Sequence, residues 1–184
     1  MKKLYKLHFL ILPQSAQGKN LRTLFPTKIW RDMSNEVRKY HYCVGCGKYF
    51  EDIGDLEAHE EWTFKYNKQK LIGIYPLCKM CHFTVHAGRA EHLGKTNLIL
   101  EHYCFVNNVS KKQAKKDLKK AWYIFYTRNK YKYKLTITEK KAWNKINKFL
   151  KKEERILNEN IDLLKKFVTK LNEREQDIII KRYG

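Results

Sequence analysis

The sequence predicts an α+β fold in which a small, turn-rich first half precedes a mainly helical second half. All three prolines and seven of the eight glycines lie at or before Gly94. Residues 95–183 contain neither, and Gly and Pro are the residues least suited to a helix interior. Two strand-like runs lie in the first half, within residues 55–77. The first half should therefore hold the sheet.

Within the first half we expect a short strand, a helix, a hairpin and a second helix. Residues 1–12 (MKKLYKLHFLIL) have a short apolar run, interrupted by Lys6 and His8, that suits a strand better than a signal peptide. Residues 27–42 have apolar positions near helical spacing. Residues 55–77 form two strand-like runs around the polar turn YNKQK, and a helix from about Lys79 to Arg89 should follow.

In the second half, capping sequences predict where three helices begin. SKKQ (110–113) and TITE (136–139) match capping boxes, and NERE (172–175) is an Asn-capped variant. In the middle helix a leucine recurs every seven residues, at positions 150, 157, 164 and 171. This stripe is a partial coiled-coil pattern, which packing on the same domain explains about as well as a homodimer does.

These patterns divide the chain into four segments. They are an N-terminal strand and helix (1–40), a small core (41–95), a basic helical segment (96–135) and a C-terminal helical extension (136–184).

The charge of the chain favours a polyanionic partner. The formal net charge is +20, and residues 111–184, with 23 basic and 9 acidic residues, contribute +14 of it. Such a field attracts nucleic acid, although a lysine-rich composition alone would also produce it. The candidate contacts with phosphate are the basic residues of 111–134, namely Lys111, Lys112, Lys115, Lys116, Lys119, Lys120, Arg128, Lys130, Lys132 and Lys134. We expect no membrane segment, because no apolar run approaches about 20 residues.

Two CxxC pairs predict a structural zinc site. Cys43 and Cys46 are separated by 31 residues from Cys78 and Cys81. Four thiolates give zinc a closed tetrahedral shell, and without an export signal metal thiolates are more expected than disulfides. This pattern places the protein in the cytoplasm and leaves Cys104 as a lone, buried thiol.

Two histidines beside the second pair suggest another metal site. His82 and His86 have i, i+4 spacing, which puts both on one face of a helix. His59, near the end of the first strand, is the candidate third ligand, and chance placement of surface histidines is the alternative. A divalent cation held there could stabilise charge on a phosphodiester while a neighbouring base activates water. The remaining histidines lack ligand spacing with one another and should be surface or core residues: His8, His41, His92 and His102.

The segments CVGCG, LEAHEEW and LCKMCHFTVHAGRA together resemble the zinc-braced branch of the HNH, or ββα-metal, endonucleases. The resemblance covers about residues 10–135 and implies a ββα core in which His59, His82 and His86 bind Mg²⁺, Mn²⁺, Ni²⁺ or Zn²⁺. It departs from the family at two positions. The general base, normally His, aligns with Glu60, and the central Asn aligns near Gly73.

The resemblance implies a DNA endonuclease acting in a bacterial cell or a phage-infected host. Glu60 could be a substitute base, His59 could be the base with Glu60 on the metal, or hydrolysis could have been lost. The last possibility leaves a non-catalytic, zinc-stabilised nucleic-acid-binding or regulatory protein, and a partner-binding protein assembled through the leucine stripe is a third. Glu57 and Glu61 are expected on the alternate face of the strand, in solvent.

Overall fold

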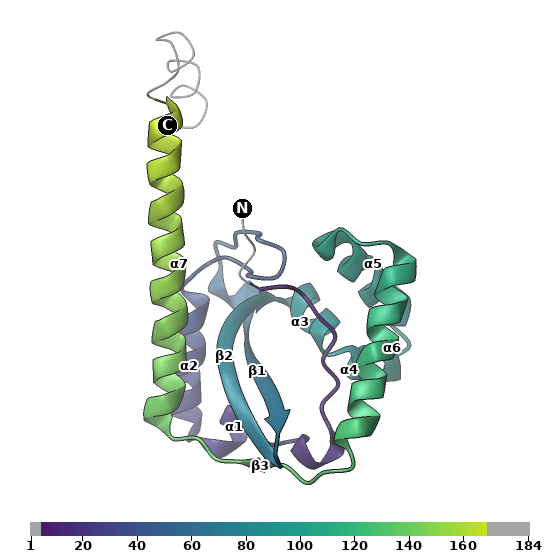
Figure 1. Ribbon diagram of the computed structural model, residues 1–184. Helices are drawn as coiled ribbons and strands as arrows, with labels where there is room; N and C mark the ends of the chain where they lie inside the picture. The colour runs from purple at the N-terminus through teal and green to yellow at the C-terminus, as the bar shows by residue number, and fades with distance from the viewer. Residues whose placement is uncertain (1–4, 169–184) are drawn as a thin grey trace. The chain divides into compact units, whose positions relative to one another are not determined.

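The computed structural model describes residues 5–168, which belong to two compact units (Figure 1). The first unit ends at Ile146 and contains the mixed α+β fold that the sequence predicts. Three of the four predicted segments lie wholly within it, and the boundary between the units falls inside the predicted extension. The helix α7 (Glu139–Val168) begins in the first unit, and its residues from 147 onward are the described part of the second.

A long antiparallel hairpin is the centre of the first unit (Figure 1). It consists of β1 (Leu56–Lys65) and β2 (Lys68–Cys78), and its predicted position is confirmed. The turn is shorter than predicted, because it is formed by Tyr66 and Asn67 alone, with φ of 48° and 57°. Positive φ at both turn residues matches the twist of the two strands. A third strand, β3 (Lys134–Leu135), which the sequence does not predict, runs parallel to the start of β2, so β1 remains an edge strand.

The prediction of an N-terminal strand is wrong for the described residues 5–12, which are extended but pair with no strand. Their apolar side chains pack into the core instead, with Phe9 and Ile11 in a cluster of helical residues and Leu7 and Leu10 in a cluster that also contains residues of both strands. The backbone N–H of Leu10 donates to Val85 O at 2.8 Å. The apolar run thus fills the core through its side chains, while its backbone forms no ladder with the hairpin beside it.

The helices of the first half position the hairpin and its neighbours. After the single turns Gln14–Ala16 and α1 (Leu21–Leu24), helix α2 (Thr27–Arg38) confirms the predicted helix and buries Trp30, Met33 and Val37. A further single turn, Ile53–Asp55, leads into β1. The helix expected over residues 79–89 is interrupted at His86, whose ψ of 54° separates α3 (Lys79–Val85) from α4 (Ala87–His92).

Two helices of the second half cover the core. They are α5 (Thr96–Asn107) and α6 (Lys111–Arg128), and the predicted start of α6 is confirmed by Ser110, whose Oγ accepts from the N–H of Gln113. Helix α5 contributes to both apolar clusters, with Val106 packed near the cysteines and Ile99 among the helices. It therefore connects the cysteine region to α6.

Helix α7 begins two residues later than the TITE capping box predicts, because its N-cap is Thr138 rather than Thr136, and Thr138 Oγ1 accepts from the N–H of Lys141. Along its second part Leu157 and Leu164 of the leucine stripe are exposed, as is Ile161. The capping sequence NERE and Leu171 lie outside the described residues.

The hairpin turn provides a test of the fold. Replacing Asn67 by Val should lower the free energy of unfolding by about 1 kcal/mol, because a β-branched residue resists positive φ. Lys70→Val, at an exposed position inside β2, should stay within about 0.5 kcal/mol of the unmodified chain. Urea denaturation followed by circular dichroism measures both. Equal losses in the two variants would contradict the two-residue turn.

Candidate metal centres and the cleft beside them

The four cysteines of the two CxxC pairs meet at one point, where the chain leaves β2 and enters α3. The ligand atoms of Cys43, Cys46, Cys78 and Cys81 all lie within 4.8 Å of one another, and Cys46 Sγ is 4.0 Å from Cys78 Sγ. Tetrahedral zinc with bonds of about 2.3 Å places its sulfurs about 3.8 Å apart. The cluster is thus compatible with the predicted structural zinc site.

Local backbone geometry allows the first pair to approach the second. The N–H of Gly47 donates to Cys43 O at 2.7 Å, and Gly47 has a φ of +79°. A Cβ at Gly45 would lie 3.0 Å from Cys81 Sγ, so a larger residue would press on that sulfur. Glycine is therefore required in this knuckle, at Gly47 for its conformation and at Gly45 for space.

The crowded thiols of this cluster change one another's pKa values. Hydrogen bonds from the other thiols hold the pKa of Cys46 below its usual value, whereas they raise the pKa of Cys78 and Cys81. Four negative thiolates at such distances repel one another unless a cation lies between them. The donor set is therefore that of a metal site. Cys104 lies apart from it and is only partly buried against the helical apolar cluster, rather than buried as expected.

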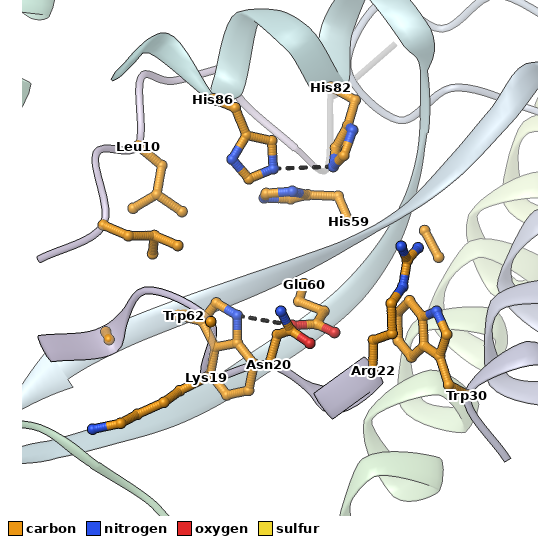
Figure 2. A pocket seen from close by; sticks show the side chains of 14 residues that line it. Leu10, Lys19, Asn20, Arg22, Trp30, His59, Glu60, Trp62, His82 and His86 are labelled. Carbon is orange, nitrogen blue, oxygen red and sulfur yellow. Dashed lines mark hydrogen bonds between the residues drawn. The ribbon is translucent and has the colours of Figure 1, made fainter. Parts of the chain in front are cut away.

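The three predicted histidine ligands also come together. Their ligand atoms lie within 4.8 Å of one another, and Figure 2 shows the rings of His59, His82 and His86 facing a common point. His59 comes from β1, His82 from α3, and His86 from the junction between α3 and α4. The Nε2 atoms of His82 and His86 are 3.1 Å apart. The three predicted ligands are thus brought together, but His59 lies near the start of β1 rather than near its end, and His86 lies at the break after α3 rather than inside one helix.

Burial makes these histidines suitable for a cation. His59 is 1% exposed, and among the described residues neither of its ring nitrogens has a hydrogen-bond partner. Leaving buried nitrogens without a partner is costly, and a metal ion would satisfy one of them. Burial and the neighbouring His59 lower the pKa of His82 to about 4 and that of His86 to about 3. Both are therefore neutral at pH 7, the form that binds metal.

The expectation that Glu61 is solvated is wrong, whereas Glu57 is solvated as expected, with a side chain that is 46% exposed. Alternate strand residues share a face, so positions 57, 59 and 61 point the same way. Glu57 contacts His82 Nδ1, and Glu61 Oε2 is 3.5 Å from His59 Nε2. The side chain of Glu61 is also only 16% exposed. Carboxylates beside metal-binding histidines orient the rings and increase their basicity.

Glu60 projects to the other side of β1, together with Trp62. Its Oε1 accepts from the N–H of Leu21 at 3.0 Å, and its Oε2 accepts from Trp62 Nε1 at 3.2 Å (Figure 2). Burial raises the pKa of Glu60 to about 7. Because β1 is an edge strand, and because the register shifts between Glu61 and Trp62, one cleft can reach both sides of it.

That cleft has a volume of about 230 Å³ and contains the three histidines and Glu60. Its opposite wall is formed by residues near α1, and it includes two basic side chains, Lys19 and Arg22 (Figure 2). The sequence does not predict this wall, because Lys19 and Arg22 are far from the histidines in the chain and belong to no recognisable motif. Lys19 Nζ donates to Tyr133 O at 2.8 Å, and the Arg22 guanidinium lies over the Trp30 ring.

Gly73, which aligns near the central Asn of the HNH pattern, lies opposite Glu61 in the hairpin. A Cβ built there would lie 2.5 Å from the ring of Tyr75. The phenol of Tyr75 thus occupies the space that a side chain at position 73 would need. An asparagine cannot replace Gly73 unless Tyr75 moves.

The basic residues of the second half are arranged along α6 and the segment after it. The six predicted lysines of α6 are all exposed, while Ala114, Leu118 and Ala121 face the core. Lys130, Lys132 and Lys134 are exposed as well. Arg128 differs, because it is half-buried and its guanidinium lies over the ring of Phe64, a residue of the hairpin.

Comparison with known proteins finds no matching family model, no matching curated protein and no matching solved structure. Within residues 5–168, every helix is too short or too polar to cross a bilayer.

The zinc site can be tested through its cysteines. Cys78→Ser should reduce the zinc content by one ion per chain and lower the melting temperature by about 10 °C or more, since zinc binding contributes to folding. Cys104→Ser should retain both the zinc and the melting temperature. Elemental analysis of the purified variants, with thermal melts, measures these effects. Unchanged zinc content in the Cys78 variant would contradict the site.

Proposed function

We propose that this chain is an HNH-type, metal-dependent endonuclease that hydrolyses phosphodiester bonds of DNA. The observation that carries the proposal is the buried cluster of His59, His82 and His86. Within residues 5–168 neither ring nitrogen of His59 makes a hydrogen bond, and the nearest acceptor described, Glu61 Oε2, is 3.5 Å from Nε2. A divalent cation bound there would stabilise the charge that develops on the phosphate and on the leaving oxygen. The choice of DNA follows the resemblance, and the net charge favours a polyanionic substrate.

In this proposal Glu60 is the general base. It lies in the same cleft as the histidines but is not one of the clustered donors, which favours Glu60 as a base over Glu60 as a metal ligand. A buried carboxylate is a stronger base than an exposed one. Its carboxylate would accept a proton from water, while Lys19 and Arg22 on the opposite wall would attract the phosphate.

Glu57 and Glu61 would hold the histidines in position. Each carboxylate lies beside a ring nitrogen and would accept its N–H, so that the remaining nitrogen of the same ring is left to face the cation. The thiolate cluster takes no part in the reaction and supports α3, which carries His82.

A second candidate is a non-catalytic, zinc-stabilised nucleic-acid-binding protein on the same scaffold. Two observations favour it. Both carboxylate oxygens of Glu60 already accept hydrogen bonds within the protein, and Tyr75 occupies the space beside Gly73. In this case the basic surface of α6 would still bind nucleic acid.

Cleavage of supercoiled plasmid by the purified full chain tests the choice. With Mg²⁺, Mn²⁺ or Ni²⁺ the unmodified protein should nick the plasmid, and EDTA should prevent this. His82→Ala should lower the rate by at least about 100-fold, because it removes a metal ligand. His92→Ala, which removes an exposed histidine of α4, should leave the rate unchanged.

Glu60→Gln separates the base from the metal site. It should lower the rate by about 10²- to 10⁴-fold while Ni²⁺ or Mn²⁺ still binds, as calorimetry would show. Absence of nicking by a zinc-loaded, DNA-binding chain would reject the nuclease and favour the second candidate.

Salt dependence of DNA binding tests the role of α6. Binding of a DNA duplex should weaken steeply with salt, and Lys115→Gln, Lys116→Gln and Lys119→Gln together should reduce the slope of log K against log salt by about 0.9 for each phosphate that is no longer neutralised. A control with three lysines near the hairpin turn, at positions 65, 68 and 70, carries the same change of charge. Equal effects of the two triple variants in fluorescence anisotropy would contradict a specific role for α6.

A further inference from the structure

One histidine outside the proposed reaction site contacts the thiolate cluster. His102, on α5, has its Nε2 3.1 Å from Cys81 Sγ. His102 does not have the spacing of a metal ligand relative to the other histidines, and it is 21 residues from Cys81 in the chain. The contact is made by the fold.

The direction of this hydrogen bond follows from the chemistry of a metal-bound thiolate. Cys81 Sγ carries no proton when it binds zinc, so it can only accept. The ring Nε2 of His102 must then carry the proton and donate it. A hydrogen bond to a charged acceptor is stronger than one between neutral groups.

The surroundings of Cys81 leave its sulfur little freedom. Gly45 approaches it so closely that an added Cβ would lie 3.0 Å from Sγ. Helix α5 packs against the same region through Val106, and the side-chain amide of Asn107 donates to Leu7 O at 2.9 Å. His102 is therefore held against the sulfur by a helix that is itself fastened to the core beside the contact.

We propose that His102 belongs to the zinc site as a positioning residue, donating its Nε2–H to the Cys81 thiolate so that retention of zinc depends on α5. The proposal rests on zinc at the four cysteines and is independent of nuclease activity. It gives α5 a direct polar contact with the metal centre. The basic helix α6 is connected to that centre indirectly, because it packs against α5. Loss of a hydrogen bond to a metal ligand typically weakens metal binding by about 10- to 100-fold.

Zinc release from the full, zinc-loaded chain tests this connection. In the presence of an excess of a metallochromic chelator, His102→Ala should release zinc about 10- to 100-fold faster than the unmodified chain. His102→Gln, whose amide can also donate, should restore part of the difference. His92→Ala, the matched removal of an exposed histidine, should behave as the unmodified chain does.

Cobalt substitution provides a readout that a merely structural role would not change. In the Co²⁺-loaded chain, removing the hydrogen bond makes the Cys81 sulfur more electron-rich, so the sulfur-to-cobalt charge-transfer band of His102→Ala should move to lower energy. His102→Gln should lie between the two. The ligand-field bands should keep their four-thiolate pattern in every variant.

Three results would overturn the proposal. The first is release kinetics and a charge-transfer band in both His102 variants that equal those of the unmodified chain. The second is a change of the ligand-field bands in His102→Ala, which would make His102 a direct ligand. The third is an unmodified chain that takes up neither zinc nor cobalt at its cysteines. Failure of plasmid cleavage affects none of these measurements.

Discussion

The convergence of four thiols is the constraint on which the rest of the first unit depends. It brings the loop that follows α2 against the junction of β2 and α3. The backbones of these two parts of the chain are joined by the hydrogen bond from Val44 N–H to Pro76 O. The apolar cluster around the cysteines includes residues from the N-terminal segment, both strands, α3 and α5. Without a cation between them, the four sulfurs inside that cluster could not all be thiolates, because the charges would repel one another.

The second centre is built on the same few residues. Cys81 and His82 are neighbours on α3, so the two side chains point to different sides of one short helix. On one side the thiolates fasten the helix to the knuckle, and on the other the imidazoles meet His59 of β1. A rotation of α3 would disturb both centres together. The geometry of the histidines therefore depends on the cysteine cluster.

Much of this arrangement could be predicted from local patterns, because CxxC and HxxxH spacings and strand-like runs depend on short-range geometry. The prediction of an N-terminal strand is wrong because an apolar run indicates burial without indicating whether its backbone pairs with a neighbouring strand. The shared face of Glu57 and Glu61 follows from the parity of strand positions, which the sequence displays. The place of Arg22 in the cleft and the contact of His102 with Cys81 depend instead on tertiary packing, since no spacing rule connects positions so far apart.

Because Cys81 and His82 are adjacent on α3, the histidine cluster depends on the cysteine cluster more than the cysteine cluster depends on the histidines. Substitution of a cysteine disturbs the platform that carries the imidazoles, whereas substitution of a histidine leaves the thiolate shell intact. A change at the histidine cluster should therefore leave α3 in place, whereas loss of the cysteines should displace α3 and, with it, His82.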